Sequence, residues 1–111
     1  MQRRESAVVV PFQPRPGDLM KAIRLLSKDS GKVFFGKHAR ERMAGRGFSD
    51  RDALYVLGIG EIKGEITPGK QSGEWKCKIV AKLRGSREAG VVTIVLNLSQ
   101  VFVKTVEWED P

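Results

Sequence analysis

The chain has 111 residues, of which 41% are hydrophobic and 30% are charged. This length suits one compact domain and excludes two domains with separate cores, and the apolar fraction excludes a wholly disordered chain. Twenty Lys and Arg residues against thirteen Asp and Glu residues give a net charge of +7, which favours polyanions such as RNA or DNA as partners, although a solvated basic surface without any partner produces the same balance.

The composition also argues against a membrane span, export and metal binding. The apolar run from Val91 to Leu96 is far shorter than the roughly 20 residues of a membrane helix. The N-terminus has two arginines and a short apolar run, but the run is broken by Pro11 and lacks a proper h-region and a cleavage site, so export is not expected. The single cysteine, Cys77, cannot form an internal disulfide, and with the single histidine it offers too few ligands for zinc. We expect a cytoplasmic protein that uses no metal and no other cofactor.

Residues 1–16 are expected to form a flexible arm. They include three prolines, whose fixed φ and missing N–H disfavour a helix. The apolar stretch from Ala7 to Val10 could add to the edge of a sheet. Residues 17–111 then form the single folded domain.

Three helices are expected in the first half of this domain. Asp18 is a plausible N-cap, and apolar residues recur at helical spacing after it, so a first helix runs to near Ser30. A second helix covers about residues 37–45 and is stopped by a pair of glycines. The third helix starts at a capping box formed by Ser49 and Asp52.

Beyond Gly60 the apolar residues alternate every second position, which predicts strands. A first strand near residues 62–66 is joined by a hairpin loop to a strand over residues 75–83, whose odd-numbered residues form an apolar face. The opposite face of that strand is basic and carries Lys76, Lys78, Lys82 and Arg84. A continuous apolar run over residues 91–98 predicts a central strand covered on both faces, and a last strand covers residues 101–108. The expected fold is α+β, with about three N-terminal helices packed on one face of a roughly four-stranded antiparallel sheet.

The second helix carries the most distinctive pattern, KHARERMAGRG at residues 37–47. On a helical wheel Arg42 and Arg46 follow His38 along one stripe, at about 40° and 80°, beside the apolar side of the helix. Arg40 is expected to point to water. Arginines at such a boundary can present the guanidinium group to a phosphate, to a carboxylate or to a row of carbonyls.

Two interpretations of this stripe stay open. In the functional one, neutral His38 removes the proton of an RNA 2′-OH group, Arg42 and Arg46 stabilise the phosphorane, and an acid protonates the leaving oxygen, so no metal is needed. In the structural one, an arginine of the stripe binds an acidic residue of the last strand, and His38 only caps or lines the start of the helix. The acidic candidates are Glu107, Glu109 and Asp110.

Basic side chains of the helix and the sheet could together follow a phosphate backbone. The candidates are Lys37, Arg40, Lys76, Lys78, Lys82, Arg84 and Lys104, of which Lys78 or Lys104 could also assist catalysis. Lysines on strands have a second explanation, because they prevent pairing at exposed sheet edges. The aromatic residues Phe34, Phe35, Trp75, Phe102 and Trp108 are expected in the core rather than on a base-stacking surface.

The block His38-Ala39-x-x-Arg42-Met43-x-x-Arg46-Gly47, followed by a capped helix and a strand meander, resembles a family of small bacterial domains of unknown function. That family is placed near the RelE and BrnT toxins, in the barnase- and RelE-like ribonuclease group, and the similarity covers about residues 19–109. The resemblance implies a RelE-like fold and a toxin-like, metal-independent endoribonuclease with His38, Arg42 and Arg46 as catalytic residues. It also implies RNA as substrate, with or without the ribosome, an acidic antitoxin as partner, and a positive φ at Gly47.

Three classes of function are therefore expected. An endoribonuclease predicts loss of cleavage, with the fold retained, when His38 or Arg42 is replaced by alanine. A non-catalytic nucleic-acid-binding module predicts salt-dependent binding without a cleaved product. An interaction domain for an acidic, antitoxin-like segment predicts a stable heterodimer that excludes nucleic acid.

Overall fold

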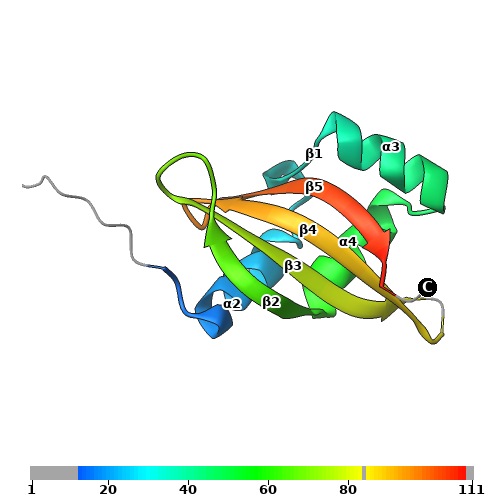
Figure 1. Ribbon diagram of the computed structural model, residues 1–111, viewed down its shortest axis with the longest axis horizontal. Helices are drawn as coiled ribbons and strands as arrows, with labels where there is room; N and C mark the ends of the chain where they lie inside the picture. Colours follow the sequence, from blue (N-terminus) through cyan, green and yellow to red (C-terminus); the bar gives the residue numbers. More distant parts are fainter. Residues whose placement is uncertain (1–12, 84, 110–111) are drawn as a thin grey trace, which may run out of the picture.

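The structure is a computed structural model, and it describes residues 13–83 and 85–109. In this part the chain forms three α-helices and one five-stranded, mostly antiparallel sheet, which makes an α+β fold (Figure 1). The proposed strand addition by Ala7 to Val10 lies outside the described residues, as do Arg84 and Asp110. None of the described helices is long and apolar enough to cross a membrane.

The elements follow in the order α2 (Pro16–Leu26), a 3-10 turn (Ser30–Lys32), β1 (Val33–Phe35), α3 (Lys37–Arg46), α4 (Asp50–Ile59), β2 (Glu61–Pro68), β3 (Glu74–Leu83), β4 (Arg87–Leu96) and β5 (Gln100–Trp108). The strand order in the sheet is β1-β5-β4-β3-β2, and β1 pairs parallel with β5 while the other neighbours are antiparallel. The expectation of about four strands is wrong because it misses β1. Three residues are too few to show a hydrophobic period, and β1 is a strand only through its pairing with β5.

The first helix begins and ends earlier than expected. It starts at Pro16, whose fixed φ and missing N–H suit the first helical position, so the last residue of the predicted arm belongs to the helix. Asp18 is not the N-cap but lies in the first turn, where a carboxylate interacts favourably with the helix dipole. The helix ends at Leu26, and the residues up to Ser30 form a turn before the 3-10 segment.

The predicted boundaries of α3 and α4 are confirmed. Gly47 ends α3 in the left-handed conformation with φ 73°, which glycine adopts without steric cost. Ser49 and Asp52 form the predicted capping box: the Asp52 N–H donates to Ser49 Oγ at 3.0 Å, and the Ser49 N–H donates to Asp52 Oδ2 at 2.9 Å.

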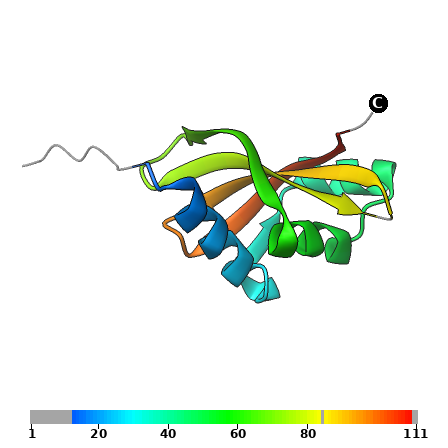
Figure 2. The same cartoon turned by 90° about the horizontal axis from the view of Figure 1, so that it is seen from below.

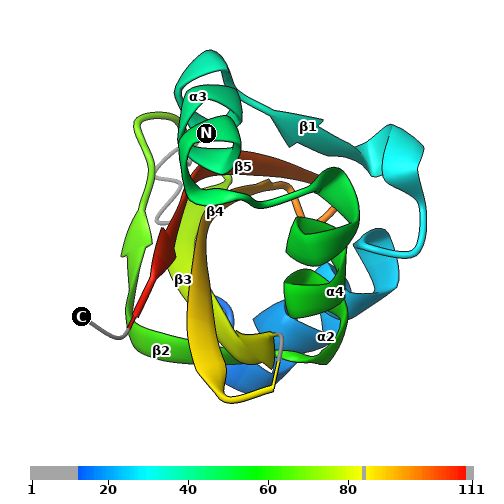
Figure 3. The same cartoon turned by 90° about the vertical axis from the view of Figure 1, so that its right-hand side faces the viewer.

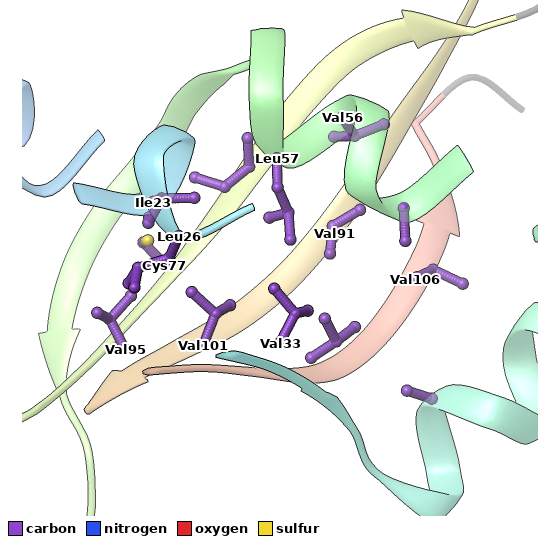
Figure 4. Close-up of a cluster of buried hydrophobic side chains, with 14 of the residues drawn as sticks. Ile23, Leu26, Val33, Val56, Leu57, Cys77, Val91, Val95, Val101 and Val106 are labelled. Atoms are coloured by element: carbon purple, nitrogen blue, oxygen red, sulfur yellow. The ribbon is translucent and has the colours of Figure 1, made fainter. Parts of the chain in front are cut away.

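The core lies between the sheet and two of the helices. Both α2 and α4 lie on the same side of the sheet (Figure 2), and the sheet curves around them (Figure 3). Apolar side chains of these helices meet the inner face of the sheet, and several of them are drawn in Figure 4. The fully buried members include Leu19, Ile23, Val56, Leu57, Ile79, Val91, Val95, Val101, Val103 and Val106.

The second helix in chain order, α3, lies apart from α2 and α4 at the β5 end of the sheet (Figure 3), whereas the expectation placed all helices on one face. β1 pairs only with Val101 to Val103 of β5, and α3 packs against β5 on that same side (Figure 3). Its apolar residues Ala39 and Met43 are buried there. α3 therefore protects an edge that the short strand β1 leaves open.

The outer face of the sheet, opposite α2 and α4, carries no described helix. The predicted central strand β4 is central, but it is not covered on both faces. Its inward residues Val91 and Val95 are fully buried, whereas Ile94 and Leu96 on the outer face are only half-buried.

Candidate nucleic-acid interface

Arg46 holds α3 on the sheet. Its Nη1 donates to the backbone oxygen of Val106 at 3.1 Å, and its own carbonyl accepts a bond from Nε1 of Trp108 at 3.3 Å. The structural interpretation expected a carboxylate as the partner, but the structure has a carbonyl of the last strand. Because this bond ties the guanidinium group to the last strand, we assign Arg46 a structural role rather than a substrate phosphate.

Arg40 is exposed, as expected, and it is also bonded within the protein. It forms an ion pair with Asp50 at the start of α4, and its guanidinium carbon lies 4.4 Å from the centre of the Phe35 ring. Its charge therefore pairs with α4 and its flat face packs on β1. We do not keep Arg40 among the nucleic-acid-binding residues.

His38 and Arg42 form a pair on the exposed side of α3. Arg42 donates from Nε to Nε2 of His38 at 3.3 Å, across one helical turn. The lone pair of Nε2 is the acceptor in this bond. Within the described ranges, no partner binds the outer N–H groups of Arg42, and Lys37, which is also exposed, has no ion-pair partner.

The same end of α3 is favourable for an anion. Its N-cap is Gly36, and no side chain of the described part caps the helix. The N–H groups of the first turn therefore stay available, and the helix dipole is positive at this end. Together with Lys37 and Arg42 they suit a phosphate group.

Half of the outer sheet face is neutralised by an ion-pair cluster, which consists of Lys63, Lys78, Glu88, Glu107 and Glu109. Lys78 donates to Glu109 Oε1 at 2.8 Å and to Glu107 Oε2 at 3.2 Å. Lys63 binds the same oxygen of Glu109 at 3.2 Å and lies 3.7 Å from Glu88. With three carboxylates around two lysines, the cluster does not attract a polyanion, so Lys78 is a poor candidate for either phosphate binding or catalysis.

The cluster shifts the pKa values of its central pair. Burial alone raises the pKa of Glu109, but hydrogen bonds from Lys78 and Lys63 help to outweigh it, and the pKa is held below the ordinary 4.5. The hydrogen bond to Glu109 raises the pKa of Lys78 above the ordinary 10.5. The Glu109 contribution to stability is therefore fully present above its unfolded pKa and is lost as the pH falls through its folded pKa. The Lys78 contribution is lost only as the pH rises through a folded pKa above 10.5.

We therefore expect the urea midpoint of the wild type to fall more steeply between about pH 5 and about pH 3 than that of Glu109→Gln. The neutral amide cannot be protonated in this range, so the acid-sensitive interaction is absent from the variant. Glu65→Gln is the matched control, because Glu65 is an exposed carboxylate on β2 without an ion pair in the described part of the chain. Equal pH slopes for the wild type and Glu109→Gln would contradict the assigned role of the cluster.

The other half of the outer face carries an aromatic–lysine row, defined as Phe34, Phe102, Ile94 and Lys76. These residues are consecutive partners across β1, β5, β4 and β3: Phe34 pairs with Phe102, Phe102 with Ile94, and Ile94 with Lys76. Phe34 is 46% exposed and Phe102 is 36% exposed, so the expectation that both lie in the core is wrong. The alternation with buried Val33, Val101 and Val103 was the available sequence signal for this outward placement.

A hollow of about 790 Å³ lies over this row. Its lining residues are Phe34, Pro68, Gly69, Lys70, Gln71, Glu74, Lys76, Ile94, Leu96, Gln100, Val101, Phe102 and Lys104. Lys104 comes at a shift in the register between β4 and β5 and is exposed. None of the three lysines of the hollow forms an ion pair with a described residue, so the lining has more positive than negative charge.

The last predicted nucleic-acid-binding residue in the described part of the chain is Lys82. Lys82 is exposed on β3, beside its cross-strand partner Glu88. β3 lies inside the sheet between β4 and β2, so protection of a sheet edge does not explain its lysines.

Cys77 is buried, and burial raises the pKa of its thiol, as fits a small core residue. The described residues contain no group of three or more side chains that could hold a metal ion.

A comparison of the chain with protein-family models, with curated proteins and with solved structures finds no match. The resemblance carried by the HAxxRMxxRG block therefore stays an expectation.

Proposed function

We propose that this protein binds RNA through the N-terminal end of α3 and through two lysines of the outer sheet face, Lys76 in the aromatic–lysine row and Lys104 beside it. The observation that carries the proposal is the distribution of unpaired cations. Ion pairs or backbone bonds engage Arg40, Arg46 and Lys78. Within the described ranges, Lys37, Arg42, Lys76 and Lys104 have no acidic partner, and these four lie on or beside α3, β5 and β3. A polyanion fits such a surface better than a neutral partner does.

The test is the salt dependence of RNA binding. Each cation that contacts a phosphate adds about 1 to the slope of log affinity against log salt concentration. We expect Arg42→Ala and Lys104→Ala each to weaken binding and to lower that slope by about 1, measured by anisotropy of a labelled RNA over a salt series. Lys21→Ala, which removes an exposed lysine of α2, is the matched control and should leave the slope unchanged. Equal slopes for all variants would overturn the proposal.

Metal-independent cleavage by His38 is the second candidate function, and the His38–Arg42 hydrogen bond favours it. A base and a phosphate ligand lie one helical turn apart on an exposed helix. In the observed arrangement Arg42 occupies the lone pair on Nε2, so His38 accepts a substrate proton only after Arg42 turns to the phosphate. In this candidate function the protein is a RelE-like, toxin-type ribonuclease and its partner is an acidic antitoxin, as the HAxxRMxxRG resemblance implies.

Product analysis separates the two candidates. The purified protein and His38→Ala are incubated with a mixed-sequence RNA in EDTA, alone and with ribosomes. Fragments ending in 2′,3′-cyclic phosphates from the wild type alone would support cleavage. Intact RNA in both reactions, with RNA binding retained, would leave the binding function alone.

A further inference from the structure

The aromatic–lysine row has the arrangement of a surface on which nucleic-acid bases stack. Phe34 and Phe102 are paired residues of adjacent strands, so their Cα atoms lie about 4.8 Å apart and their side chains project from the same face. Each retains more than a third of its surface in solvent, which is unusual for two adjacent large apolar side chains. An aromatic ring on an open sheet offers a flat face to any base.

The Phe102 ring is held in place at the start of α3. A Cβ atom added to Gly36 would lie 2.6 Å from Phe102 Cζ, so the ring packs directly on the glycine backbone. A side chain at position 36 would displace the Phe102 ring from this position. Gly36 is also the N-cap of α3, immediately before Lys37 and His38. The row is therefore continuous with the free end of α3.

The charge around the row identifies the occupant. Lys70, Lys76 and Lys104 line the hollow, and Glu74 is its one acidic lining residue among those described. Glu74 accepts a bond from the Gln71 backbone N–H at 3.3 Å. An apolar protein surface or a lipid chain would pack against the two rings but would offer no anionic group to the surrounding lysines. A polynucleotide uses both parts, because its bases stack and its phosphates bind cations.

We propose that the aromatic–lysine row binds the bases of a single-stranded polynucleotide, with Phe34 and Phe102 as stacking residues and Lys76 and Lys104 as phosphate contacts. This inference rests on the proposed RNA binding and specifies the strandedness of the ligand. A duplex keeps its bases stacked inside and cannot offer them to the rings. Single-stranded RNA is therefore the preferred ligand.

The test compares a labelled 12-nucleotide single-stranded RNA with a duplex of the same length and uses the variant Phe34→Leu/Phe102→Leu. Leucine keeps an apolar side chain against Gly36 but removes the aromatic face. Because stacking contributes about 1–3 kcal/mol per base, we expect the double variant to bind the single strand at least about fivefold more weakly, with little change for the duplex. Tyr55→Ala is the control, since Tyr55 is an aromatic residue of α4 that is 49% exposed in the helical layer.

Three results would overturn the row as a stacking surface. The first is that the wild type binds the duplex more tightly than the single strand. The second is that the folded double variant binds the single strand with unchanged affinity. The third is that Tyr55→Ala loses as much single-strand affinity as the double variant does. Folding of each variant is checked by its urea midpoint. If Arg42→Ala weakens RNA binding while the double variant does not, the proposed RNA binding stands and only the row is rejected. If neither variant weakens binding, both proposals fail.

Discussion

Trp108→Ala is expected to lower the free energy of unfolding by about 3 kcal/mol, because truncation of a large aromatic residue in a packed site costs about 3–5 kcal/mol. The Trp108 ring centre lies 4.6 Å from the Phe48 ring centre. The Arg87 guanidinium carbon lies 4.0 Å from the centre of the Trp108 ring. Nε1 of Trp108 also donates to the carbonyl of Arg46. The substitution removes all three contacts and so loosens the C-terminal end of α3 from β5.

Urea denaturation followed by circular dichroism measures this effect. Trp108→Phe serves as the control, since it keeps a ring against Phe48 and loses only the indole hydrogen bond, at an expected cost of about 1 kcal/mol. A loss below about 1 kcal/mol for Trp108→Ala would show that Trp108 does not anchor α3.

Arg46→Ala is expected to destabilise the fold by about 1–2 kcal/mol, because it leaves the Val106 carbonyl without its donor at the edge of β5. Arg42→Ala is the matched variant four residues earlier on the same helix. Arg42 binds only the exposed His38 among the described residues, so its loss should change the free energy of unfolding by no more than about 0.5 kcal/mol.

The same pair of variants should show the reverse order in RNA binding. Arg42→Ala loses a phosphate contact, whereas Arg46→Ala should bind RNA like the wild type once its folded fraction is taken into account. A stable Arg46→Ala variant that fails to bind or cleave RNA would restore Arg46 to the site and contradict its structural assignment. The two arginines therefore provide a direct separation of stability from function.

The helices with strong local signals were predictable. Gly47 and the Ser49–Asp52 capping box act within a few residues of chain, so α3 and α4 have the expected boundaries. The alternation of β3 likewise identified its buried face correctly at Trp75, Cys77 and Ile79. β1 was missed because its strand character depends on β5, which lies almost 70 residues further along the chain.

The candidate site was predictable in composition but not in arrangement. Lys76 and Lys78 are two residues apart on one face of one strand, and no local rule distinguishes them. The register of β5 brings Glu107 and Glu109 to Lys78 and leaves Lys76 beside the aromatic residues. Arg42 and Arg46 differ in the same way, because only the position of α3 along β5 places the Val106 carbonyl beside Arg46.

The sequence by itself determined the α+β class, the termini of α3 and α4, the apolar face of β3 and the basic stripe that starts at His38. Each of these depends on propensity, capping or periodicity, which act over one or two turns of chain. Tertiary structure alone decided that Phe34 and Phe102 face outward as neighbours, that Lys78 is neutralised and that Arg46 binds the sheet. These outcomes require strand order and register, which join residues 29 to 68 positions apart through pairings that no local segment specifies.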